Sequence, residues 1–365
     1  MNQFDRIFGQ APAKKFLLNA IKTKNVPHAF LFTGRDGIGK EFTAIQFANL
    51  VNQSIIKSDK ISSSILNLSE PYIKYIFPLP RGKNETEKDG PYDKLSTDVI
   101  DEIKELINGK ISNPYNSIKL ANANNIKISS IRDIKKFILL DYSDIPFRII
   151  LISYSHLMSV EAQNALLKQL EEPPAGIIFI LCTSKPSMLR ETIRSRCWEI
   201  NFLPLSDEDI TEILISKFNV DENIARKVSI FSNGSVTEAL DLIDNNFEGM
   251  FNDTIQILRL SFAKKYNSAY SIIEKYSSQN YSNLKLILKL LIVWLNDLNK
   301  EKHKLSGIYF EGHQDTLEKF NTKFSSLKVS PLVEKLDEYS YLINRNINPS
   351  LITMNIVNEL AAFIR

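Results

Sequence analysis

Residues 29–41 read Ala29-Phe30-Leu31-Phe32-Thr33-Gly34-Arg35-Asp36-Gly37-Ile38-Gly39-Lys40-Glu41. A short apolar segment, a loop with three glycines and a helix that starts at Lys40 form the strand–loop–helix layout of a phosphate-binding P-loop. Gly34, Gly39 and Lys40 have the G-x-x-x-x-G-K spacing. Glycines let backbone N–H groups turn towards phosphate oxygens, beside the positive end of the helix. The pattern therefore predicts a loop of the nucleotide-binding type that includes Gly34, Gly37, Gly39 and Lys40.

Two positions that an ATP-hydrolysing P-loop protein needs hold other residues. The residue after the lysine should offer a Ser or Thr hydroxyl to Mg²⁺, and here it is Glu41. Residues 147–152 form a nearly continuous apolar segment, typical of a central strand in a parallel sheet. Ser153-Tyr154 follows this segment where such an ATPase has Asp-Glu. We therefore expect no metal site, no cofactor and no intrinsic ATPase activity; whether the loop still binds a nucleotide is left open.

The composition argues against several classes of protein. The 45 basic and 42 acidic residues give a formal net charge of +3, which is too balanced to require nucleic acid or an acidic membrane as a partner. A purely nucleic-acid-binding protein would show a basic stripe with interleaved aromatic residues. The two cysteines, Cys182 and Cys197, are too few for a four-thiolate zinc site or a disulfide scaffold.

No segment suggests a membrane or export. The N-terminal residues contain no apolar signal region. The longest apolar segment, Leu284 to Trp294, is broken by two lysines and is shorter than the roughly 20 residues that a membrane span needs. We expect a cytoplasmic protein without a membrane partner.

The first 205 residues have the pattern of an α/β domain with a parallel sheet flanked by helices. Further helices are predicted at 130–138, starting at Ser130 with Asp133 three residues on, and at 160–172, capped by Ser159. Further strands are predicted at 177–181 and 198–202. Residues 53–125 are the least regular part, and they include a charged loop at 80–91. Arg81 and Lys83 could contact nucleic acid there, but a solvated loop is the favoured alternative.

The spacing of apolar residues changes from that of a strand to that of a helix at Leu203-Pro204-Leu205-Ser206, which indicates a domain boundary. Three helices are predicted in residues 206–245, and Ser235 with Glu238 gives the third a capping box. Residues 246–365 are almost wholly helical and fit a bundle of five or six helices. Their apolar faces could form a core or an oligomer contact, and a core is favoured.

Several motifs, taken in order, resemble those of the bacterial DNA polymerase III clamp loader, an AAA+ assembly. They are Phe8-Gly9-Gln10, residues 27–34, Asn164-Ala165-Leu166-Leu167-Lys168-Gln169-Leu170-Glu171-Glu172-Pro173-Pro174 and Ser195-Arg196-Cys197. The similarity covers residues 1–245 by motif and the remainder by domain order. It implies an AAA+ domain (1–205), a three-helix lid (206–245) and an all-α collar that joins subunits (246–365).

Within this family the chain resembles the delta-prime type of subunit, because several nucleotide functions are missing together. The lid motif Gly234-Ser235-Val236-Thr237 also has no arginine, and residues 53–125 form an atypical insert where many relatives have a zinc module. The resemblance implies a non-hydrolysing component of the DNA polymerase III holoenzyme. Its partners would be gamma/tau-type and delta-type subunits and, through the complex, the sliding clamp and primer–template DNA. The alternative is a gamma/tau-like ATP-binding motor subunit.

The resemblance also gives Arg196, in Ser195-Arg196-Cys197, the role of an arginine finger. Its guanidinium would reach ATP bound to a neighbouring subunit, since it is always charged and can bond two phosphate oxygens at once. The alternative for Arg196 is a structural ion pair. Arg190 and Arg194 precede it, so an exposed basic rim is expected ahead of the last strand.

Overall fold

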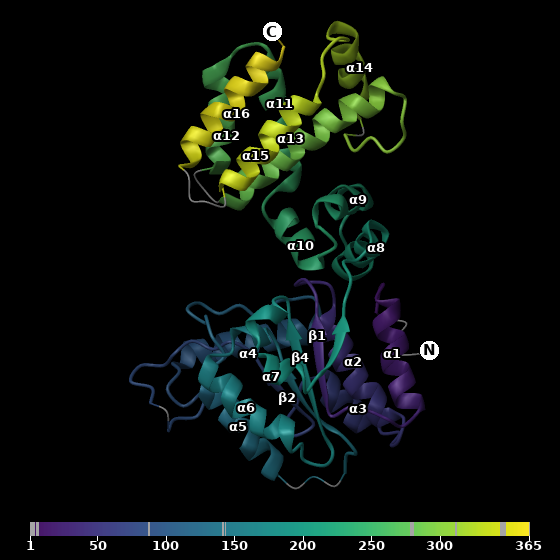
Figure 1. Cartoon of the computed structure of the whole chain (residues 1–365), viewed down its shortest axis with the longest axis vertical. Helices are drawn as coiled ribbons and strands as arrows, with labels where there is room; N and C mark the ends of the chain where they lie inside the picture. The colour runs from purple at the N-terminus through teal and green to yellow at the C-terminus, as the bar shows by residue number, and fades with distance from the viewer. Residues whose placement is uncertain are drawn as a thin grey trace. The chain divides into compact units, whose positions relative to one another are not determined.

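The computed structural model describes residues 4, 7–86, 88–140, 142, 144–277, 281–310, 312–343 and 348–364. Its first part contains one sheet of five parallel strands in the order β2-β3-β4-β1-β5 (Figure 1). The strands are β1 (Ala29–Thr33), β2 (Ile73–Ile76), β3 (Arg148–Ile152), β4 (Ile177–Thr183) and β5 (Trp198–Asn201). In the register of the central pairs, Phe32 lies opposite Cys182, and Ile152 opposite Leu181. The predicted parallel sheet is therefore confirmed.

Helices cover both faces of this sheet. They are α1 (Ala11–Lys22), α2 (Lys40–Gln53), α3 (Asp59–Leu66), α4 (Thr97–Ser112), α5 (Ile128–Leu139), α6 (Val160–Glu171) and the short α7 (Glu191–Arg194). Successive side chains of a strand point to opposite faces. Phe30 accordingly joins a core with residues of α1 to α4, whereas Leu31 joins a second core with residues of α5 to α7. Because both faces are covered, β1 to β4 are buried at every position, whereas three of the four residues of the edge strand β5 are exposed.

The predicted helix starts can be compared with the structure at two positions. Ser159 caps α6 as its sequence pattern indicates, because its Oγ accepts a hydrogen bond from the Ala162 N–H at 3.2 Å. The start predicted at Ser130 is wrong. Helix α5 begins at Ile128, and the Ser130 N–H already donates to the Lys127 carbonyl, so Ser130 lies within the first turn. Asp133, which seemed to complete that cap, instead accepts from Lys74 at 2.6 Å.

Three helices follow the sheet: α8 (Asp207–Phe218), α9 (Glu222–Phe231) and α10 (Val236–Asp244). The turn before α10 uses left-handed backbone at Asn233 and Gly234, and a Cβ on Gly234 would lie 2.8 Å from the Leu205 carbonyl oxygen. By compactness the chain divides into two units, Met1–Leu240 and Asp241–Arg365. The division into three domains at residues 205 and 245 stays a prediction.

The second unit is helical, as predicted. Its helices are α11 (Phe247–Phe262), α12 (Tyr266–Ser277), α13 (Tyr281–Lys302), α14 (Gln314–Lys323), α15 (Ser330–Ile343) and α16 (Pro349–Phe363). Helix α13 packs against α11, α12, α14 and α15, and its Trp294 is buried among their side chains. Of the helices in the described ranges, none is both long and apolar enough to cross a membrane.

Candidate functional site

The P-loop connects the carboxyl end of β1 to the start of α2. Gly37 and Gly39 adopt left-handed backbone, with φ of 74° and 92°, and Gly39 is the residue before the first turn of α2. At Gly37 a Cβ would lie 2.6 Å from the Thr237 hydroxyl oxygen, so a side chain there would displace the start of α10. The structure brings Gly34, Gly37, Gly39 and Lys40 into one loop at the strand ends, where open α/β sheets bind ligands.

The Lys40 ammonium is bound by the loop itself. Its Nζ donates to the Gly34 carbonyl at 2.6 Å and to the Arg35 carbonyl, and lies 3.7 Å from the Asp36 carboxylate. The side chain is buried, and this burial lowers the pKa of Lys40 although Asp36 acts in the opposite direction. The lysine that would hold phosphate in a P-loop is therefore bonded to backbone carbonyls of its own loop.

Glu41 is the centre of a second, buried network. Its carboxylate accepts hydrogen bonds from Lys110 at 2.6 Å, from Tyr75 at 3.0 Å and from Ser153. Burial alone would raise the pKa of Glu41, but the Lys110 charge and the three hydrogen bonds together hold it below its ordinary value. Three elements that are distant in sequence, β2, α4 and the end of β3, thus converge on the residue after the P-loop lysine.

Lys110 is the member of this network that sequence reasoning missed. It lies in the last turn of α4, is 5% exposed, and also donates to the Asn116 carbonyl at 2.7 Å. Glu41 and Ser153 stand at the two motif positions that hold Mg²⁺ in an ATPase. The Lys110 ammonium group therefore neutralises the Glu41 carboxylate at the position where the motif would hold the metal.

The residues at this site do not fit a bound magnesium nucleotide. The cavity that they line measures about 40 Å³, whereas small-molecule sites usually measure about 300–1,000 Å³. Asp36 and Glu41 are the carboxylates in its lining, and Glu41 is already paired. Within the described ranges, no group of three or more His, Cys, Asp or Glu side chains could hold a metal ion.

The neighbouring strand ends and the start of α10 make further contacts around the loop. The Thr183 hydroxyl lies 3.1 Å from Nδ1 of His156, whose pKa is lowered chiefly by burial. Ser184 donates to Asp36 at 3.1 Å. From the start of α10, the Val236 N–H donates to the Gly37 carbonyl at 3.0 Å. The Thr183 and Ser184 hydroxyls and the Val236 N–H are therefore already in contact with other groups of the chain.

Arg196 lies between α7 and β5, away from the P-loop network in sequence and contacts. Its guanidinium is in an ion pair with Glu171 at 2.9 Å and donates to the Thr192 carbonyl at 2.8 Å. The side chain is 35% exposed and lines an open pocket of about 640 Å³ together with Trp198 and Glu199. The ion pair expected under the structural alternative is thus present, and the guanidinium still reaches solvent.

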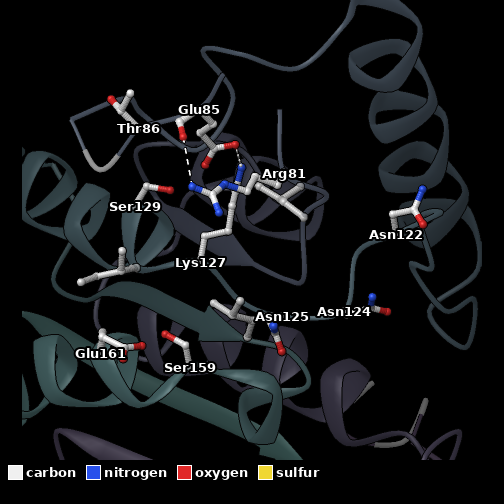
Figure 2. Close-up of a pocket in the computed structure, with 13 residues that line it drawn as sticks. Arg81, Glu85, Thr86, Asn122, Asn124, Asn125, Lys127, Ser129, Ser159 and Glu161 are labelled. Atoms are coloured by element: carbon white, nitrogen blue, oxygen red, sulfur yellow. Dashed lines mark hydrogen bonds and ion pairs between the residues drawn. The ribbon is translucent and has the colours of Figure 1, made fainter. Parts of the chain in front are cut away.

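A separate pocket of about 420 Å³ lies at the start of α5 (Figure 2). The three donors of the Lys127 ammonium are taken by the Pro80 and Pro91 carbonyls and by Glu85. Arg81 is exposed and donates to the Glu85 carbonyl, and the Ser129 hydroxyl faces its guanidinium (Figure 2). The Ser129 Oγ is buried and finds no hydrogen-bond partner among the described residues. Arg81 is therefore exposed, as the prediction of a solvated loop expects, and it also lines this pocket.

The parallel sheet, the P-loop at its strand ends and the flanking helices define a P-loop α/β domain of the AAA+ type. The family model described as "DNA polymerase III, delta subunit" matches residues 9–206, which is more than half of the chain. The chain belongs to this clamp-loader family.

The chain is also similar to individual proteins. The chain is 28% identical over 247 residues to the DNA polymerase III subunit tau of Bacillus subtilis (strain 168), covering 66% of this chain and 37% of the relative. It is 30% identical over 251 residues to subunit gamma of Buchnera aphidicola subsp. Schizaphis graminum, covering 66% and 58%. The chain thus spans less than two thirds of either relative. A solved gamma subunit-related protein from Thermotoga maritima aligns over 96% of this chain and 99% of its own, with 13% identity and a TM-score of 0.39.

Proposed function

We propose that this chain is a non-hydrolysing, delta-prime-type subunit of the clamp loader, which helps to load the sliding clamp onto primed DNA. One observation carries the proposal: the buried network of Glu41, Lys110, Tyr75 and Ser153 fills the position of the metal. Hydrolysis requires a cation between the β- and γ-phosphates and an oriented water. A site whose carboxylate is neutralised by an internal lysine offers neither.

A gamma/tau-like ATP-binding motor is the second candidate, because the relatives reported above are gamma and tau subunits. Those similarities cover the shared domain and do not separate the two types. The residues at the P-loop favour the first candidate, since a motor would need Lys40 released from its carbonyls and Glu41 released from Lys110.

In this proposal Arg196 acts on ATP held by a neighbouring subunit. Its contact with Glu171 is an ion pair of two part-exposed side chains, which is typically worth no more than about 1 kcal/mol. A bidentate bond to a triphosphate is stronger, because both partners are charged and the geometries match. The arginine can therefore exchange Glu171 for a phosphate at small cost when a neighbour supplies one.

The same proposal includes primer–template DNA as a partner through the complex. The pocket at the start of α5 offers one exposed guanidinium, from Arg81, and an unpaired buried hydroxyl, from Ser129. Arginine, serine and helix N-termini are common donors to DNA phosphates. This pocket is where we expect the chain to contribute to such a contact.

The test is ATP turnover by the chain alone and within a reconstituted clamp loader. The purified chain should hydrolyse no more ATP than its Lys40→Ala variant, and clamp loading by the complex should be the same with either. Turnover by the isolated chain that Lys40→Ala abolishes would reject the proposal in favour of the motor. A complex that assembles and loads clamps without this chain would reject both.

A further inference from the structure

An aromatic pocket lies wholly within the second unit, at the end of α11 and along one side of α14. It measures about 360 Å³, which is within the range of ligand-binding sites. Four rings in mutual contact form its wall, with centroid distances of 5.9 Å from Phe262 to Trp294, 5.0 Å from Phe262 to Phe320 and 4.9 Å from Phe320 to Phe324. The three phenylalanines are only half-buried, so apolar ring surface remains in contact with water.

The floor of this pocket contains an unsatisfied donor. Trp294 is 2% exposed, and its indole N–H finds no acceptor among the described residues. A buried N–H without an acceptor is unfavourable, and buried tryptophans usually have a partner for it. A ligand that combines an apolar group with a hydrogen-bond acceptor would satisfy both the rings and this N–H.

The rim of the pocket is positively charged. Arg259 in the last turn of α11 and Lys319 and Lys323 on α14 line it, are exposed, and make no ion pair with any described residue. The pocket residues of α14 follow helical spacing, at 316, 319, 320 and 323. The acidic Asp315 and Glu318 of the same helix do not line the pocket, so among the described residues its lining has three cations and no carboxylate.

We propose that this pocket binds a short acidic segment of a partner protein, with one large apolar side chain against the rings and carboxylates on Arg259, Lys319 and Lys323. The charge of the rim selects the acidic partner, and the apolar wall selects the anchor side chain. A peptide also supplies backbone carbonyls next to its anchor, which the Trp294 N–H requires. The pocket shares no lining residue with the P-loop site or with the pocket at Arg196, and the inference does not depend on the proposed function.

The test uses three labelled seven-residue peptides and the full chain. The first has a central phenylalanine flanked by three aspartates on each side; the second replaces the aspartates by lysines, and the third replaces the phenylalanine by serine. We expect the acidic phenylalanine peptide to bind, as followed by fluorescence anisotropy, and to bind more weakly as salt is raised. The other two peptides should bind at least about tenfold more weakly.

Matched variants locate the binding. Lys319→Glu with Lys323→Glu should weaken binding by about tenfold or more, whereas Lys304→Glu with Lys328→Glu, an equal charge change at exposed positions outside the pocket, should leave it unchanged. Trp294→Phe keeps an aromatic ring and removes the N–H, so it should weaken peptide binding at a temperature where circular dichroism shows the variant still folded. Weaker binding by a folded variant separates a ligand contact from a structural one.

Three results would overturn the inference. The acidic phenylalanine peptide could fail to bind at about 1 mM, which corresponds to only about 4 kcal/mol of binding free energy. It could bind no better than the lysine peptide, or bind equally to the chain with Lys319→Glu and Lys323→Glu. Dodecanoate, which combines an apolar chain with a carboxylate, serves as a competitor. If it binds to the pocket and the acidic peptide does not, the site takes a small amphiphile and the inference is wrong.

Discussion

Replacing Glu41 by glutamine should destabilise the first unit by about 3 kcal/mol, because it leaves a buried ammonium without its counter-charge. The magnitude follows from the surroundings of Lys110. That side chain is 5% exposed, its ion pair with Glu41 measures 2.6 Å, and its other acceptor is the neutral Asn116 carbonyl at 2.7 Å. Glutamine keeps one acceptor oxygen for Tyr75 or Ser153, which places the loss at the lower end of the usual range of about 3–5 kcal/mol for breaking a buried pair.

A double-mutant cycle isolates the pair. Lys110→Met should cost a similar amount, since it leaves a buried carboxylate, while the double variant should recover about 2 kcal/mol relative to the sum of the single losses. Urea unfolding can be followed for each unit separately, because Trp198 lies in the first unit and Trp294 in the second. A Trp294→Phe background leaves Trp198 as the reporter of the first unit.

The pH dependence gives an independent check on the same carboxylate. The pKa of Glu41 in the folded chain is held below its ordinary value of 4.5. At pH values between these two pKa values the folded chain therefore binds fewer protons than the unfolded chain. Its contribution to stability is complete above pH 4.5 and is lost as the pH falls through the folded pKa. Glu41→Gln should lack this part of the acid destabilisation. Equal stability of Glu41→Gln and the original chain, or strictly additive losses in the cycle, would refute the reasoning.

Three further predictions concern the complex. Arg196→Ala should lower the DNA-stimulated ATPase of a reconstituted clamp loader. The loss should be smaller than the factor of about 10³–10⁵ that one arginine finger can supply, because other sites keep their arginines, and Arg194→Ala should have a smaller effect. Full activity with Arg196→Ala would show that the residue is structural. Arg81→Ala should weaken DNA binding by the complex, and Lys83→Ala should weaken it less, when affinity is measured as a function of salt concentration. Equal effects would indicate that only the net positive charge of the loop contributes to binding. A chain ending at Asn246 should fail to join the other subunits in gel filtration, and undiminished association would contradict the collar assignment.

The regular parts of the first unit were predictable because each rests on local pattern. The apolar run at 148–152, the glycines around Lys40 and the cap at Ser159 fix a strand, a loop and a helix start from a few neighbouring residues. Helix α14 has few apolar residues, so its sequence gives little signal of a buried face. The helix start at Ser130 was misplaced because a serine and an aspartate three residues apart also occur inside a first turn.

The contents of the P-loop site were only half predictable. Glu41 and the absence of Asp-Glu after β3 can be read from motif spacing, and they indicate that the metal ligands are missing. Lys110 cannot be found in this way, since it lies 69 positions after Glu41, in the segment whose pattern was least regular, and only the folded sheet brings them together. Its sole local signal is a lysine within the last turn of an amphipathic helix, which is an ordinary surface feature.

The pairing of Glu41 with Lys110 also constrains how this protein can evolve. A single change of Glu41 to threonine would restore the hydroxyl of an ATP-hydrolysing relative but would leave the lysine charge buried and uncompensated. A single change of Lys110 would likewise leave the Glu41 carboxylate buried without a counter-charge. Either single substitution towards a catalytic site therefore gives a less stable intermediate, so the effects of the two positions are epistatic. Natural variation at either position should accordingly be accompanied by a change at the other.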